Sequence, residues 1–186
     1  MRLLLLFLVL PAWVRALPPE QEAFWQELRK LCGQAFAGRI VESTSTTDAQ
    51  FAGKTLVMHV AACGAGEVRI PFHVGDNRSR TWVITRTPGG LRLKHDHRHE
   101  DGAEDKITQY GGDTAKAGAA TQQDFPADAF TANLIAAAKT NIWSLFLTPG
   151  KTFGYGLRRE TDGRRFRVDF DLTRPVAPPP PAWGTR

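Results

Sequence analysis

The chain has 186 residues, with 24 lysines and arginines against 19 aspartates and glutamates, which gives a net charge of +5 at neutral pH. This excess is small and no long basic run carries it, so the composition does not favour nucleic-acid binding. The length suits a single domain that buries one hydrophobic core.

Residues 1–16, MRLLLLFLVLPAWVRA, have the organisation of a secretory signal peptide. One arginine precedes an apolar run from Leu3 to Leu10, and Val14 and Ala16 are the small residues that a signal peptidase recognises. A transmembrane helix needs about 20 apolar residues, so this run is too short to be one. We therefore expect cleavage after Ala16 and an exported protein, periplasmic or secreted, without a transmembrane segment.

The segment after Pro18 predicts a helix over residues 20–32. Acidic residues open it, a glycine follows it, and Phe24, Trp25 and Leu28 recur at helical spacing. This helix would cover one part of the core of the domain, which we expect to span residues 17–175.

The only two cysteines, Cys32 and Cys63, belong to a chain that we expect in an oxidising compartment. A lone pair in that setting predicts one disulfide bond between them. A redox or nucleophilic role is less favoured, because the pair lacks C-x-x-C spacing and an activating charge beside either thiol.

Beyond the helix, apolar and polar residues alternate through most of the chain, which is typical of antiparallel strands with one buried face. Strands are expected at 35–43, 54–62, 67–74 and 80–87, with shorter ones at 106–110 and 119–124. A hairpin through residues 75–79 would pair Phe72 with Trp82 and leave His73 on the solvent side. The Pro-Gly turn that follows would set Trp82 opposite His95.

The C-terminal part contains two further turn signals. A two-residue turn at Asp162-Gly163 would pair Tyr155 with Phe170 inside the sheet. A turn at Pro149-Gly150 would place Phe146 opposite Phe153, also inside.

This last register leaves Trp143, Leu145 and Leu147 as an apolar stripe on the opposite face. The stripe would pack under a helix or form an exposed surface for a partner protein.

Residues 126–139 begin with a proline and predict a second helix, with Phe130, Leu134 and Ala138 on its buried face. The preceding QYGGDT, residues 109–114, has no lysine and helix at P-loop spacing and is interpreted as a flexible loop rather than an anion cradle. The proline-rich tail, 176–186, predicts a polyproline-type extension.

Together these elements predict a mainly β domain: an antiparallel meander that forms a barrel or a strongly curved sheet, with an N-terminal helix and one helix before the C-terminal hairpins. With its helix before a glycine-containing first strand, FAGRI, the chain resembles the lipocalin-like (calycin) superfamily of small β-barrels. The family's G-x-W signature is missing, because Arg39 and Ile40 follow Gly38. The chain is also similar to secreted proteins of Gram-negative bacteria, a resemblance that implies no activity.

The stretch LRLKHDHRHEDG, residues 91–102, holds three of the chain's five histidines. His95, His97 and His99 share a strand face with two leucines, so they would point inward and rise from the core towards the mouth of the barrel. The simplest interpretation is that this face becomes polar where the strand leaves the barrel. Proton-transfer chemistry is a less favoured alternative.

A metal site for zinc or copper is another alternative. Residues two apart on a strand are separated by about 6.6 Å, so His95 and His97 could hold one ion, whereas His99 is too far from His95 to share it. A further ligand would come from elsewhere in the chain, with these candidates: His59, Asp101, Glu104 and Asp105.

The sequence offers little for catalysis, since no serine lies in a G-x-S-x-G frame. We therefore favour a non-catalytic binding protein for a small apolar or amphipathic ligand. The alternatives are a metal carrier or metal-dependent enzyme built on the histidine pair and an interaction module of the cell envelope built on the 143–147 stripe. The candidate ligand-binding residues are Trp82, His95, His97, Tyr155 and Phe170.

Overall fold

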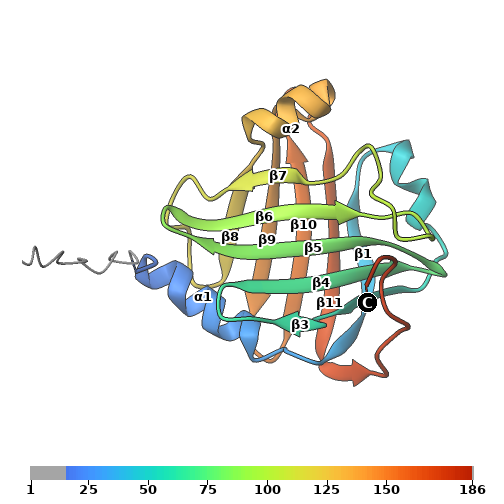
Figure 1. Ribbon diagram of the computed structural model, residues 1–186, viewed down its shortest axis with the longest axis horizontal. Coiled ribbons are helices and arrows are strands. Elements are labelled where there is room, and N and C mark those ends of the chain that lie inside the picture. Colours follow the sequence, from blue (N-terminus) through green and yellow to red (C-terminus); the bar gives the residue numbers. More distant parts are fainter. Residues whose placement is uncertain (1–15, 186) are drawn as a thin grey trace, which may run out of the picture.

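The computed structural model describes residues 16–185, in which antiparallel strands form one sheet that curls into a nearly closed barrel (Figure 1). The strand order is β7-β6-β5-β4-β2-β1-β11-β10-β9-β8, with β3 paired to β4. The strands are β1 (Ala35–Ser43), β2 (Leu56–His59), β3 (Ala62–Cys63), β4 (Glu67–Val74), β5 (Asn77–Thr87), β6 (Gly90–His97), β7 (Tyr110–Asp113), β8 (Gln122–Pro126), β9 (Asn141–Thr148), β10 (Thr152–Arg159) and β11 (Arg165–Val176). The helices are α1 (Pro19–Arg29) and α2 (Ala129–Leu134), with 3₁₀ helices η1 (Thr46–Phe51) and η2 (Ala136–Ala138). The expected fold is confirmed.

Helix α1 closes one end of the barrel. Proline at its first position fits a site where no amide donor is needed. Its apolar stripe is fully buried in the core at Phe24, Trp25 and Leu28. On the same helix, the buried Gln21 donates from Nε2 to Thr114 Oγ1 at 2.9 Å, so the helix is also tied to the segment that follows β7.

The expected disulfide is confirmed between Cys32, just after α1, and Cys63 in β3. The bond therefore fastens the closing helix to the wall of the barrel. No helix within residues 16–185 is both long and apolar enough to cross a membrane. Of the expected signal peptide, only Ala16 belongs to the described residues.

The two ends of the sheet, β7 and β8, meet with no strand pairing between them. The backbone N–H of Asp128 donates to Gly111 O at 3.0 Å, and the Thr131 hydroxyl donates to the same carbonyl at 2.8 Å. A Cβ atom at Gly112 would overlap the carbonyl oxygen of Pro126. The expectation of a flexible loop at 109–114 is therefore wrong: the two glycines form the strand that closes the barrel, where only a bare backbone fits.

Two hairpin registers differ from the expected ones by two residues. In the first, Trp82 pairs with Ile70 rather than Phe72, because the turn after Val74 is tighter than expected and a bulge interrupts the ladder near His73. The expected pairing of Trp82 with His95 is confirmed. A shift of two residues keeps every side chain on its face, so the inward face of β5 was predicted correctly.

In the β10–β11 hairpin, Tyr155 pairs with Val168, and Phe170 pairs with Phe153 instead of Tyr155. The connection is longer than the expected two-residue turn, since Arg159 and Arg164 still share a backbone hydrogen bond before the loop begins. This register is again displaced by two residues, and the buried faces stay as predicted.

The register of the β9–β10 hairpin differs from the expected one by one residue, so the inward and outward faces of β9 are exchanged. Thr148 pairs with Thr152 across three residues, 149–151, rather than across two. The N–H of Lys151 closes the turn on Thr148 O, and Gly150 adopts the positive φ of 65° that it requires. The connection thus has three residues instead of the expected two, and this one additional residue explains the altered register.

The apolar stripe of β9 consequently points into the barrel. Trp143, Leu145 and Leu147 are buried, so an exposed partner surface on this stripe is ruled out. Phe146 lies on the outer face instead, where the Arg167 guanidinium lies 4.1 Å from its ring centre. The sequence prediction that placed Phe146 inside was wrong for the same reason of register.

The second helix is shorter than predicted. Ile135 adopts a non-helical conformation and separates α2 from η2. Phe130 is 52% exposed rather than buried, whereas Ala138 in η2 is buried as expected.

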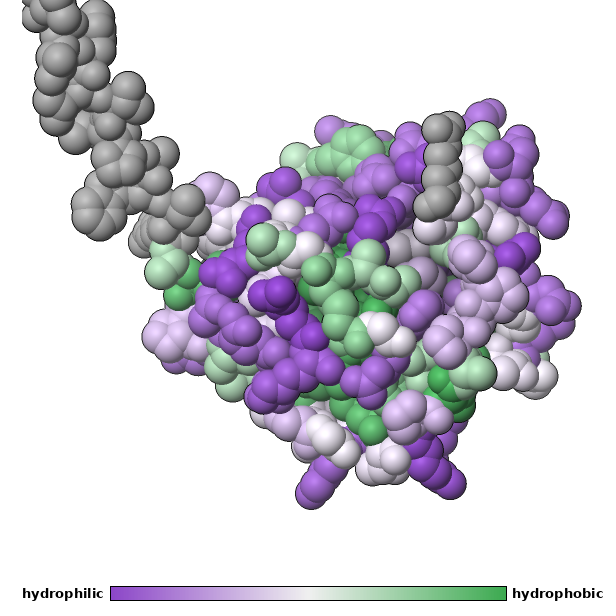
Figure 2. Space-filling view, turned by 60° about the horizontal axis from the view of Figure 1, so that its bottom comes forward, coloured by the Kyte–Doolittle hydropathy of each residue, from purple (hydrophilic) through white to green (hydrophobic). Residues whose placement is uncertain are grey.

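The outer surface contains two departures from expectation. His73 is 4% exposed rather than solvent-facing. The proline-rich tail does not extend away from the domain as expected but folds back on the barrel, with the N–H of Trp183 donating to Arg78 O at 3.1 Å. The face seen from below carries mostly hydrophilic side chains around a hydrophobic area (Figure 2).

Candidate ligand cavity

A cavity of about 290 Å³ opens at the end of the barrel away from α1. Strands β4, β5, β6, β7, β9, β10 and β11 provide its walls, and η1, η2 and the β10–β11 loop surround its mouth. The wall is strongly aromatic; its rings belong to Phe51, Phe72, Trp82, Tyr110, Trp143, Tyr155 and Phe166.

His95 lies in the cavity wall with both ring nitrogens hydrogen bonded. Its Nδ1 lies 3.0 Å from the carbonyl oxygen of Tyr110 and its Nε2 lies 2.8 Å from the Tyr155 hydroxyl. A carbonyl only accepts, so Nδ1 carries the proton and Nε2 accepts from Tyr155. Burial lowers the pKa of His95 to about 3, and the imidazole is neutral at physiological pH.

Tyr155 links this imidazole to the aromatic wall. Its ring stacks on Trp82 with ring centres 4.3 Å apart and planes inclined by 12°. Burial raises the pKa of Tyr155 well above its ordinary value, so the hydroxyl remains a donor. The indole centred 5.3 Å from the His95 ring is Trp143, from the strand whose face was mispredicted.

Tyr110 forms the other half of the cluster. Its ring stacks on His95 at a centre distance of 4.3 Å, and its hydroxyl lies 3.1 Å from His97 Nε2. Burial raises the pKa of Tyr110 to about 12, and burial, assisted by the nearby Arg80, lowers the pKa of His97 to about 4. The floor of the cavity therefore consists of neutral aromatic and imidazole groups at pH 7.

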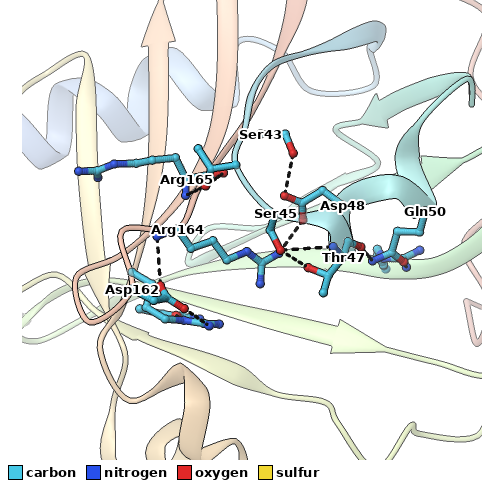
Figure 3. Close-up of polar contacts among 12 residues, drawn as sticks. Ser43, Ser45, Thr47, Asp48, Gln50, Asp162, Arg164 and Arg165 are labelled. Carbon is cyan, nitrogen blue, oxygen red and sulfur yellow. Dashed lines mark hydrogen bonds and ion pairs between the residues drawn. The ribbon is translucent and has the colours of Figure 1, made fainter.

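An ion pair between Arg164 and the buried carboxylate of Asp48 lies at the mouth of the cavity (Figure 3). Arg164, from the β10–β11 loop, donates from Nη2 to Asp48 Oδ1 at 2.6 Å, and Ser43 donates to the other carboxylate oxygen at 3.0 Å. Asp48 is 3% exposed and belongs to η1. This contact holds η1 against the hairpin loop and so fixes the shape of the opening.

The structure brings His95 and His97 to the same wall, as the sequence predicted. Coordination by His95 would require Nε2 to give up Tyr155, and Nδ1 is occupied by a backbone carbonyl. Across residues 16–185, no group of three or more His, Cys, Asp or Glu side chains has the arrangement to hold a metal ion.

The other candidate metal ligands lie elsewhere. His99 is exposed and lies 4.0 Å from Asp105, whereas Glu104 pairs with Arg98 at 2.9 Å. Asp101 accepts a backbone N–H within its own loop, and the cavity wall contains none of the proposed additional ligands, His59 included.

Four of the five candidate ligand-binding residues, Trp82, His95, His97 and Tyr155, line the cavity. Phe170 does not; it is fully buried beneath Trp82 in an edge-to-face contact at 6.1 Å between ring centres.

The sequence did not identify Tyr110, Trp143 or Arg80 as residues of the wall. Tyr110 was predicted where a short strand (106–110) runs into a flexible loop (109–114), with no contact to His95, and Trp143 was placed on the wrong face of its strand. Arg80 carried a usable signal, because it is two residues before Trp82 and therefore shares the inward face of β5.

The fold and the cavity define a class: a nearly closed antiparallel barrel, consistent with a lipocalin-like fold, with an aromatic and histidine-containing cavity at one end. No protein-family model, curated protein or solved structure matches the chain.

Proposed function

We propose that this protein is an exported, non-catalytic binding protein that holds one small apolar or amphipathic molecule in the cavity at the barrel mouth. The observation that carries the proposal is the cavity itself. Its volume of about 290 Å³ is just below the range of about 300–1,000 Å³ for small-molecule sites, which suits a small ligand. An aromatic wall with a few polar groups is also the usual composition of such sites.

The hydrogen bonding of the cluster supports binding over catalysis. A general base needs a pKa near the working pH, whereas the pKa values of His95 and His97 are lowered to about 3 and about 4. Tyr155 and the Tyr110 carbonyl hold His95 in one tautomer. These contacts give the cavity a fixed shape and place fixed polar groups in its wall, which favours selective binding.

Export is supported by two independent features. Residues 1–16 have the pattern of a signal peptide. The disulfide between Cys32 and Cys63 suits an oxidising compartment.

The binding proposal is tested with prodan, a neutral naphthalene dye whose emission shifts to the blue in apolar surroundings. We expect saturable binding with quenching of tryptophan emission, because Trp82 and Trp143 line the cavity. Ala138→Phe should weaken binding at least tenfold by filling the cavity from η2.

Ala136→Phe is the matched control, since Ala136 lies on the exposed side of the same short helix. This variant should bind like the wild type. Absence of dye binding to the folded wild type, or equal binding by both variants, would contradict the proposal.

A further inference from the structure

Among residues 16–185, one charged side chain in the cavity wall has no counter-ion. Arg80 lies on the inward face of β5, paired across the sheet with His97 and two residues from Trp82. Its guanidinium donates to Gln50 Oε1 at 3.0 Å and to Asn77 Oδ1 at 3.0 Å, which are both neutral acceptors. Among the described residues, no carboxylate lies within ion-pair distance of it.

The other two arginines of the wall differ from Arg80 in this respect. Arg164 is paired with Asp48 at 2.6 Å, and Arg159 is paired with Asp162 at 3.1 Å. The imidazoles beneath them are neutral. The cavity therefore contains one positive charge that its own carboxylates do not balance.

An uncompensated charge in a part-buried wall is costly unless a partner offsets it. Burial lowers the pKa of Arg80 because it disfavours the charged form, although an arginine stays charged at any physiological pH. A guanidinium has five N–H donors in a planar arrangement that matches a carboxylate, and only part of them are used here. The cavity wall contains a second donor without a partner: Nε of Arg164 is buried and has no acceptor within residues 16–185.

We propose that the cavity selects amphipathic carboxylates: the carboxylate of the ligand binds Arg80 at the mouth, and its apolar body lies against Tyr110 and Trp143 below. This inference rests on the proposed binding function and adds the chemical class of the ligand. The unbalanced guanidinium disfavours a cationic ligand of the same shape. A neutral ligand would leave the charge of Arg80 uncompensated.

The test compares three ligands of equal chain length, decanoate, decanol and decylamine, by calorimetry and by displacement of prodan from the mature protein at low salt and neutral pH. We expect decanoate to bind at least tenfold more tightly than decanol, and decylamine to bind most weakly. Added salt should weaken the binding of decanoate and leave that of decanol unchanged, since screening acts only on the charged ligand.

Arg80→Gln removes the charge but keeps a hydrogen-bonding side chain. It should weaken decanoate binding by about tenfold or more, the usual contribution of a hydrogen bond to a charged group, and change decanol binding less than twofold. Arg92→Gln is the control, because Arg92 is exposed and paired with Asp113 away from the cavity. It should bind all three ligands like the wild type.

Equal binding of decanoate and decanol by the wild type would overturn the inference while leaving the binding function intact. Retention of the decanoate preference in folded Arg80→Gln would overturn it too. Failure of every ligand and of prodan to bind would instead contradict the binding function itself. If Arg80→Gln does not fold, the ligand series and its salt dependence on the wild type still decide the matter.

Discussion

The imidazole of His95 shows how strongly the surroundings of a residue can set its chemistry in this barrel. Its ring is 3% exposed, is stacked on Tyr110 and accepts a hydrogen bond from Tyr155. Protonation would turn Nε2 into a donor to the Tyr155 hydroxyl and, more importantly, would place a charge in an apolar interior. The neutral form is therefore part of the native structure.

This state predicts how stability depends on pH. In the unfolded chain His95 titrates near its ordinary value of about 6.5, whereas its folded pKa is about 3. Between these values the unfolded state binds more protons, so the free energy of unfolding is highest above pH 6.5 and falls as the pH falls towards 3. The slope for one such group is about 1.4 kcal/mol per pH unit.

His95→Gln removes this group, and its free energy of unfolding should fall less steeply between pH 6.5 and pH 4 than that of the wild type, by about the slope of one proton. Urea denaturation of both proteins at several pH values measures the difference. His59, His73 and His97, whose pKa values are also lowered, are present in both proteins, so the difference between the two slopes reports mainly on His95. Identical slopes would show that His95 is protonated in the folded protein.

At the scale of single elements, strand β7 decides whether the barrel closes. Gly111 and Gly112 bring its backbone against the end of β8 and the start of α2, and Thr131 bonds to both the N–H and the carbonyl of Gly111. Tyr110, the residue before them, thereby reaches its place on His95. Closure and the cavity wall therefore depend on the same four-residue strand.

Gly112→Ala should destabilise the protein by about 1–3 kcal/mol, the usual cost of overpacking, because the new methyl group would overlap the carbonyl oxygen of Pro126. Gly89→Ala is the control, since a Cβ there meets only Thr87 Oγ1 at 3.9 Å. It should change stability by less than about 0.5 kcal/mol. Thermal and chemical denaturation compare the two, and equal stabilities would refute the role assigned to β7.

At the scale of the whole molecule, the two ends of the barrel differ: one is closed and the other contains the cavity. Helix α1 and the disulfide between Cys32 and Cys63 close one end, and the cavity opens at the other. Because these features are separated by the length of the barrel, stability and binding can be altered independently.

Replacing both cysteines by serine should lower the free energy of unfolding by about 3–4 kcal/mol, from the chain entropy of a loop with a sequence separation of 31. Prodan affinity should stay within twofold of the wild-type value under native conditions. Denaturation without reductant and dye titration measure the two quantities. A large loss of affinity in the folded variant would mean that the closed end shapes the cavity.

The alternation of the sequence determined which residues face the interior wherever the register was correct or displaced by two. It therefore placed Trp82, His95, His97 and Tyr155 inside, because a strand repeats every two residues irrespective of its partner. The lone cysteine pair predicted the disulfide, and helical spacing predicted the helix that precedes the first strand. These properties follow from local pattern and composition.

Only the tertiary structure decided the rest of the cavity. A single additional residue in the turn at 149–151 exchanged the faces of β9 and brought Trp143 inward, and no local pattern distinguishes that turn from a two-residue one. Tyr110 reaches His95 because the sheet curls until β7 meets β8. Within residues 16–185 Arg80 lacks a counter-ion, and the carboxylates of Asp48 and Asp162 pair with Arg164 and Arg159 instead. Such contacts join residues distant in sequence, so their physical cause is the closure of the whole barrel.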